Sequence, residues 1–303
     1  MDLRAFWIRL THWEYWPFEI VYLPVFAYWL WLSVRARSLL YFTASNTLME
    51  NGGMLGESKA DIFNRLPREY IPNTLFVDPS SEIKLLEVRI RKSQLHFPVI
   101  VKPNIGERGA AVEKILDFAA LINYHELADY NYLIQEYIDL PLETGVFYYR
   151  FPNNTNGTVS SIVYKELLSV TGNGVDTLKQ LVHKKDRAYL QHKVLSKRFC
   201  KTWESIPSNG ETVMLEEIGN HSRGTKFLSG NRYITKRLTE TFDQVVDQME
   251  GFYFGRFDIR SASWEDLEEG RFLILELNGG GSEPGHIYDP GISIIEAYRS
   301  IFH

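Results

Sequence analysis

Three oxygen-bearing side chains lie in two short apolar segments in the C-terminal part of the chain. Asp258 lies in "GRFDIR", and Glu276 and Asn278 lie in "LELN". Because successive side chains of a strand alternate between faces, Glu276 and Asn278 point to the same face. The short acidic turn "WEDLEEG" between the two segments favours antiparallel pairing, which would bring the three oxygens together. Since Mg²⁺ prefers oxygen ligands, the spacing predicts a metal site formed by Asp258, Glu276 and Asn278.

A lysine upstream is suited to bind a phosphate near such a metal. "FPVIVKP" is a short apolar run that ends with Lys102 before its proline, and it predicts a strand that carries an ammonium group at its tip. In the following "NIGERGAAV", the glycines Gly106 and Gly109 allow backbone amides to turn toward an anion, before a helix expected to begin near Ala110 or Ala111. The same glycines would also suit a simple hairpin, and the sequence leaves this alternative open.

Composition restricts the class of protein. With 303 residues, 45% of them apolar and 23% charged, the chain is long enough to bury a sizeable core as one compound domain or two lobes. A net charge of -5 argues against a nucleic-acid partner, whose phosphates normally require a basic surface. The single cysteine, Cys200, excludes an internal disulfide and a cysteine-rich zinc site, and it fits a reducing compartment.

The N-terminal segment differs from the rest of the chain. Five of the seven tryptophans fall within the first 31 residues, and "YWPFEIVYLPVFAYWLWLSV" contains a single charge, Glu19. A helix of this length reaches about 30 Å, the thickness of a bilayer core, but Pro17 and Pro24 weaken the case for an ordinary spanning helix. We therefore expect residues 1–45 to form an aromatic, membrane-associated helical segment that spans, re-enters or lies on the membrane. The alternative is an aromatic helix packed against the rest of the protein or a partner.

The other segments predict the elements that position these residues. A short helix is expected to begin after Ser58, a good N-cap. "YLIQEYI" predicts a strand, and "GVFYYRF" and "VSSIVYKELL" predict a hairpin around the turn "PNNTNGT". The basic stretch "VDTLKQLVHKKDRAYLQHKVLSKR" and the later "RYITKRLTETFDQVVDQMEGF" are helical in pattern, and Gly251 is expected to stop the second of them.

The order of "FPVIVKPNIGERGAAV", "LIQEYI", "ETGV", "GRFDIR" and "ILELNGGGSEPG" resembles the ATP-grasp superfamily, in particular D-alanine–D-alanine ligases and the cyanophycin-synthetase type. The resemblance covers roughly Lys59 to Pro290. It implies an α+β ATP-grasp fold, in which two α+β lobes grip ATP between antiparallel sheets. The implied ATP-grasp domain covers residues 46–303, with a nucleotide-binding lobe at about 90–140 and a C-terminal lobe with the metal site at about 141–303. The usual relatives begin with a complete α/β domain, and here the aromatic segment stands in its place.

The resemblance also implies roles for individual residues. ATP would be bound by Lys59, Lys102, Gly106, Arg108, Gly109, Glu136, Tyr137, Ile138 and Glu143. The metal ligands would be Asp258, Glu276 and Asn278, and the catalytic cations Arg256, Lys165 and Arg223. The loop that opens with Gly279 would give amides and space beside the substrate, whose contacts would be Gly280, Gly281, Glu283 and His286, with Tyr288 beside them.

The activity implied by the resemblance is ATP-dependent ligation of a carboxylate to an amine through an acyl phosphate. Two Mg²⁺ ions are expected, with Mn²⁺ as an alternative. The expected partners are a small-molecule or lipid-linked carboxylate, an amine, and a membrane, at the cytoplasmic face of the inner or plasma membrane where ATP is present. A kinase that phosphorylates a small molecule or lipid precursor without ligation, and a non-catalytic nucleotide-binding module, are the competing hypotheses. The sequence leaves the substrates and the oligomeric state open.

Overall fold

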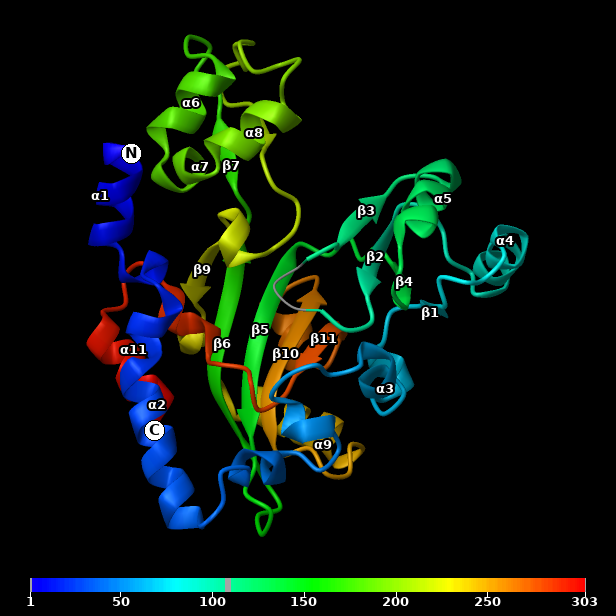
Figure 1. Ribbon diagram of the computed structural model, residues 1–303, viewed down its shortest axis with the longest axis vertical. Helices are drawn as coiled ribbons and strands as arrows, with labels where there is room; N and C mark the ends of the chain where they lie inside the picture. The colour runs from blue at the N-terminus through cyan, green and yellow to red at the C-terminus, as the bar shows by residue number, and fades with distance from the viewer. Residues whose placement is uncertain (1, 107–109, 303) are drawn as a thin grey trace. The chain divides into compact units, whose positions relative to one another are not determined.

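The computed structural model describes residues 2–106 and 110–302 (Figure 1). The chain groups into two compact units that interleave along the sequence. The large unit contains Ser33–Val163 and Gly230–Gly285, and the small unit contains Met1–Leu32, Tyr164–Ser229 and His286–His303. Helices are mixed with antiparallel strands throughout, so the predicted α+β class is confirmed.

The first sheet of the large unit has four antiparallel strands in the order β1-β4-β2-β3. Its apolar core includes Leu86 and Leu121, which are fully buried and belong to the two helices of this region. The elements are β1 (Thr74–Val77), α4 (Ile83–Lys92), β2 (Val99–Pro103), β3 (Glu113–Ile115), α5 (Phe118–Leu127) and β4 (Tyr132–Glu136).

The second sheet of the large unit carries the predicted metal ligands. Four of its strands follow the order β11-β10-β5-β6. On one face, Phe257 and Ile259 of β10 pack in a core with Leu238, Phe242 and Val245, which lie on one side of helix α9. The elements are β5 (Leu142–Tyr149), β6 (Thr158–Glu166), α9 (Lys236–Asp247), β10 (Phe254–Ser261), α10 (Trp264–Glu268) and β11 (Phe272–Asn278), with α3 (Lys59–Phe63) preceding the first sheet.

Most of the predicted elements are present. Strands occur in "FPVIVKP", "YLIQEYI", "GRFDIR" and "LILELN", β5 and β6 are adjacent as predicted for a hairpin, and the Ser58 side chain caps α3 by accepting from Asp61 N. The helix expected near Ala110 or Ala111 is wrong. Ala111 has a left-handed φ of 52°, and the chain returns as β3, which pairs with β2. This segment forms a strand because β3 pairs with β2, and local sequence does not reveal such pairing between strands.

The small unit combines helices with short strands. The basic stretch is helical as predicted and forms three short helices, around a core that includes Leu168, Val182 and Leu195. The elements are α1 (Leu3–Thr11), α2 (Phe18–Ala36, which continues into the large unit), β7 (Ser169–Thr171), α6 (Leu178–Lys184), α7 (Asp186–Leu190), α8 (His192–Arg198), β8 (Thr212–Met214), β9 (Lys226–Ser229) and α11 (Ile294–Phe302). The 3-10 helices of both units are η1 (Trp13–Tyr15), η2 (Tyr41–Ser45), η3 (Glu50–Gly53), η4 (Arg68–Tyr70), η5 (His221–Arg223), η6 (Asn231–Tyr233) and η7 (Gly285–Tyr288).

One side of α2 packs against the C-terminal helix α11. Tyr298 OH donates to Val21 O at 2.7 Å, and the rings of Tyr28 and Phe302 are 5.1 Å apart. The alternative prediction for the aromatic segment is a helix packed against the rest of the protein, and one side of α2 packs in this way. In residues 2–106 and 110–302, no helix combines the length and the apolar character needed to cross a bilayer.

Candidate active site

One face of the second sheet gathers the predicted metal ligands. In the register of β10 and β11, Asp258 lies opposite Glu276, and Arg256 lies opposite Asn278. Residues opposite each other, and residues two apart on one strand, share a face. The predicted antiparallel pairing is therefore present, and it places the two carboxylates and the amide on the same face as Arg256.

The same face continues onto β5. Glu143 lies opposite Arg260, and Gly145 lies opposite Asp258. Arg260 donates from Nη2 to Glu143 Oε2 at 2.7 Å and from Nη1 to Ile138 O at 2.8 Å. Two predicted nucleotide contacts, Glu143 and Ile138, thus lie around one arginine. This arginine is two residues, or about 7 Å, along β10 from Asp258.

A β-bulge in β11 connects this face to Lys102. The register shifts between Asp258 and Ile259, so that Leu275 has no opposite residue on β10. The Lys102 Nζ donates to Leu275 O at 2.8 Å and to Gln135 Oε1 at 2.8 Å. The ammonium group of β2 is therefore held beside the strand that carries Glu276.

The charge of Lys102 is sensitive to this environment. Lys102 is 7% exposed, and burial lowers its pKa to about 8, while Glu276 raises the pKa, Lys59 lowers it and Asp258 raises it. The geometry agrees, because Lys102 bonds the carbonyl next to Glu276, Lys59 Nζ lies 3.4 Å from Glu276 Oε1, and Asp258 lies opposite Glu276. The structure brings the predicted phosphate lysines and the predicted metal acids into one site.

This pKa predicts a pH dependence of nucleotide binding. An anion favours the charged form of Lys102, and that form is lost as the pH rises through about 8. We expect the affinity for Mg-ATP, measured by calorimetry, to fall roughly tenfold between about pH 7 and pH 9 because a charge-assisted contact is lost. Lys102→Met should bind weakly at both values and show little pH dependence, whereas Lys92→Met, at an exposed position on α4, should behave as the wild type. Wild-type affinity in Lys102→Met would contradict the assignment.

Lys59 and Glu57 extend the site from the segment before the first sheet. Lys59 Nζ lies 3.4 Å from Glu276 Oε1 and donates to Gly106 O at 2.8 Å. Glu57 Oε1 accepts from Gly279 N at 3.4 Å. Burial raises the pKa of Glu57, the bond from Gly279 lowers it, Glu276 raises it and Lys59 lowers it. Glu57 therefore adds a third carboxylate near Glu276 that sequence reasoning missed.

Arg256 forms an ion pair with Asp258. Its Nε donates to Asp258 Oδ1 at 2.8 Å, and its Nη1 donates to the carbonyl oxygen of Glu283 at 3.4 Å. A Cβ on Gly145 would lie 3.1 Å from Asp258 Oδ1 and 3.2 Å from Arg256 Cδ. Gly145 lies in the quoted "ETGV" and had no assigned role. Its missing side chain makes room for this pair and for Val163, whose Cγ1 would lie 2.9 Å from such a Cβ.

The donor set fits Mg²⁺. Asp258 and Glu276 offer carboxylate oxygens on one face, and Asn278 offers an amide oxygen two positions further. The Asn278 Nδ2 atom is buried and has no hydrogen-bond partner among the residues that the structure describes, but as a donor it is not the atom that would bind a cation. No group of three or more His, Cys, Asp or Glu residues in the described part of the chain is arranged to hold a metal, and the assignment of Asp258, Glu276 and Asn278 stays a prediction.

The glycine loop after β11 makes close backbone contacts. Gly280 N and Gly281 N donate to Gly52 O and Gly53 O at 2.9 and 2.8 Å. A Cβ on Gly279 would lie 2.5 Å from Met49 Sδ and 2.7 Å from Gly53 Cα. Glycine is thus required for the close approach of two backbone segments. The predicted substrate role of Gly280 and Gly281 stays a prediction, and their amides already have carbonyl partners.

The remaining predicted ATP contacts lie near the end of β4. Glu136 N donates to Asn73 O at 2.8 Å, and Glu136 Oε2 accepts from Asn73 N at 3.3 Å. The Lys114 ammonium lies 4.3 Å from the centre of the Tyr137 ring. These contacts fix the segment that precedes Ile138. Arg108 and Gly109 lie outside the described residues.

Three predicted site residues belong to the small unit. Lys165 Nζ lies 5.8 Å from the centre of the Phe227 ring, and Arg223 Nη1 lies 3.8 Å from Glu216 Oε1. His286 is buried, its Nε2 lies 3.3 Å from Ser300 Oγ, and burial lowers its pKa while Asp289 raises it. Their proposed roles at the site of the large unit stay predictions.

The comparisons with known proteins return ligases. No protein-family model and no curated protein sequence matches the chain. A bifunctional glutathione synthetase from Pasteurella multocida is 14% identical, with 86% of this chain and 36% of that chain covered and a TM-score of 0.45. The VanG D-Ala:D-Ser ligase from Enterococcus faecalis is 12% identical, with 81% and 60% covered and a TM-score of 0.46. A D-alanine–D-alanine ligase from Bacillus anthracis complexed with ATP is 12% identical, with 80% and 58% covered and a TM-score of 0.40.

These are ATP-grasp ligases. They are the kind of protein that the motifs resemble. The chain spans 36% to 60% of the length of these three structures. Because these identities and TM-scores are low, the support for the proposed chemistry comes from the residues of this chain and not from these structures.

Proposed function

We propose that the chain is an ATP-dependent ligase that joins a carboxylate to an amine. The observation that supports this most directly is the convergence of Lys102 and Lys59 with Asp258 and Glu276 in one unit. Two cations suited to phosphate oxygens lie beside two acids suited to a divalent cation. In the large unit, Glu143 and Arg260 on the same sheet face offer polar contacts for the ribose end of the nucleotide.

The charges of the site compensate one another before the nucleotide binds. Lys59 pairs with Glu276, and Arg256 pairs with Asp258. A triphosphate offers both cations alternative acceptors, and Asp258, Glu276 and Asn278 would then hold Mg²⁺. When bound, Mg²⁺ neutralises phosphate charge, and Mn²⁺ would serve the same purpose. We expect two ions, with Arg256 stabilising the charge of the transferred phosphoryl group.

The proposed reaction has two steps. An oxygen of the substrate carboxylate attacks the γ-phosphorus, so that a new O–P bond forms, the bond to the β-phosphate oxygen breaks, and ADP leaves. The amine then attacks the carbonyl carbon of the acyl phosphate, a C–N bond forms, and phosphate leaves as the amine gives up a proton. Positioning and charge neutralisation are the protein's contribution, and no side chain has to act as a nucleophile.

We place this activity at the cytoplasmic face of a membrane. ATP is available on that side, and the aromatic N-terminal helices offer exposed apolar surface. The substrates would be small-molecule or lipid-linked acids and amines.

Trapping the intermediate tests the ligase proposal. Purified protein would be incubated with ATP, Mg²⁺, hydroxylamine and a pool of cellular carboxylates. A hydroxamate, identified by mass, would show that an acyl phosphate forms, and its acid part would name the first substrate. ADP formed with a stable phosphorylated product and no hydroxamate would instead indicate a kinase. No ADP with any carboxylate pool or extract would indicate a non-catalytic nucleotide-binding module.

A further inference from the structure

Helix α1 exposes an apolar stripe. Leu3, Phe6, Trp7 and Leu10 follow the i, i+3, i+4, i+7 spacing of one helix face. Their exposed fractions range from 45% to 67%. In an ordinary surface helix this face would be packed against the core, and here it is in contact with solvent.

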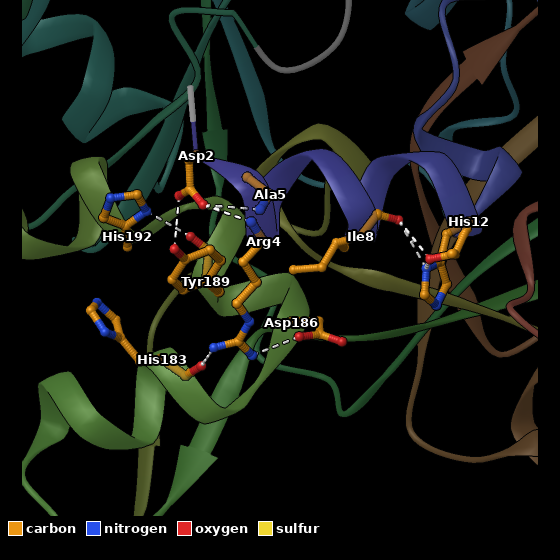
Figure 2. Close-up of polar contacts among 10 residues, drawn as sticks. Asp2, Arg4, Ala5, Ile8, His12, His183, Asp186, Tyr189 and His192 are labelled. Carbon is orange, nitrogen blue, oxygen red and sulfur yellow. Dashed lines mark hydrogen bonds and ion pairs between the residues drawn. The ribbon is translucent and has the colours of Figure 1, made fainter.

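The opposite side of α1, which carries Arg4 and the buried Ile8, packs against the rest of the small unit. Figure 2 shows Arg4 donating to His183 O at 2.5 Å and to Asp186 Oδ1 at 2.7 Å, and Tyr189 OH donating to Asp2 Oδ2 at 2.8 Å. These contacts hold the start of α1 against α6 and α7 within the small unit. These polar contacts therefore hold α1 in an orientation that exposes its apolar stripe.

Helix α2 also combines one packed side with exposed apolar side chains. Val21 is 6% exposed and lies on the side that packs against α11. The rest of the helix exposes large apolar side chains along its length, which are Phe18, Ile20, Leu23, Phe26, Leu30, Trp31 and Val34. Contiguous apolar surface of this kind marks a site of interaction.

Basic residues accompany the apolar surface. From residue 179 to residue 201, which covers α6 to α8, the chain has eight Lys or Arg residues and one acid, Asp186. That acid is paired with Arg4 of α1. Of the six exposed cations of this segment, Lys179, Lys184 and Arg198 pair with Glu204, Asp176 and Glu216. The other three are Lys193, Lys197 and Lys201. Since the whole chain has a net charge of -5, this is a local concentration of positive charge.

We propose that α1, α2 and the basic helices α6 to α8 form a docking surface for a bilayer that contains anionic phospholipid. Exposed Trp, Phe and Leu side chains suit the boundary between headgroups and acyl chains, and neighbouring lysines suit anionic headgroups. Protein interfaces are depleted in lysine, so the combination favours a membrane over a protein partner. This inference specifies the surface and lipid class behind the membrane location proposed above.

Vesicle flotation with the full chain tests the proposal. The vesicles would be phosphatidylcholine alone, or phosphatidylcholine mixed with phosphatidylglycerol. We expect binding to the mixed vesicles, at least about tenfold weaker binding to phosphatidylcholine alone, and a similar loss at high salt. Trp7→Asp combined with Leu23→Asp should reduce binding at least about tenfold by placing charge in the apolar boundary. Lys193→Glu combined with Lys197→Glu should abolish the preference for anionic vesicles.

Two controls match these changes at exposed positions of the large unit. Leu127→Asp on α5, and Lys84→Glu with Lys92→Glu on α4, should leave vesicle binding unchanged. Absence of binding to either vesicle, or binding that ignores lipid charge and all the variants, would overturn the proposal. So would a soluble dimer that becomes monomeric in the Trp7 and Leu23 variant, since a second copy would then cover the face. Because flotation needs no ATP or substrate, its result and that of the hydroxamate assay are independent.

Discussion

Glu276→Gln is expected to remove Mg²⁺-dependent ATP turnover while leaving the protein folded. The substitution keeps the shape of the side chain but removes a carboxylate that faces Asp258 and lies 3.4 Å from Lys59. We expect turnover to fall by roughly two to three orders of magnitude, the effect of losing one preorganised charged group. The pKa of Lys102 should also fall further, because Glu276 is one of the groups that raise it. Steady-state ADP release against Mg²⁺ concentration, and the pH profile of nucleotide affinity, measure both effects.

Glu240→Gln is the matched control. Glu240 also pairs with a lysine at 3.4 Å, Lys236, but on the exposed surface of α9. Neither substitution should change the free energy of unfolding by more than about 1 kcal/mol, because both ion pairs are at least partly exposed. If Glu276→Gln kept its magnesium dependence and its turnover, the metal assignment would have to be abandoned.

Gly279→Ala is expected to destabilise the large unit by about 1 to 3 kcal/mol. The added methyl group would meet Met49 Sδ and the Gly53 backbone at 2.5 and 2.7 Å, and the backbone atom cannot move aside as a side-chain end can. Separation of these segments would also disturb Glu57, which accepts from Gly279 N. Chemical denaturation measures the loss of stability, and ADP release measures the loss of activity.

Gly291→Ala provides the comparison for this change. Among the described residues, the only atom near its added Cβ would be Asp289 Oδ1 at 3.2 Å, a side-chain atom that needs to shift by only a few tenths of an ångström. We expect little change in stability there. If Gly279→Ala were as stable as the wild type and yet inactive, the loop would act on the substrate rather than through packing, as the sequence interpretation holds.

The sequence by itself determined the features that depend on neighbours along the chain. Alternation in "GRFDIR" and "LELN", with a short turn between them, predicts that Asp258 and Glu276 meet on one face, and Ser58 is a recognisable cap for α3. Periodicity and capping act over a few residues, so they can be read from sequence.

Only the tertiary structure decided the features that depend on distant partners. Lys102 bonds to Leu275 O at the β-bulge and to the buried Gln135, and the absence of a side chain at Gly145 makes room for Asp258. Each of these contacts joins residues that are far apart in the sequence. The strand β3 replaced an expected helix for the same reason, because pairing with β2 outweighed local preference. The division into two interleaved units and the exposure of the apolar stripe of α1 also depend on contacts between distant residues. Local sequence patterns do not report the strength of such contacts.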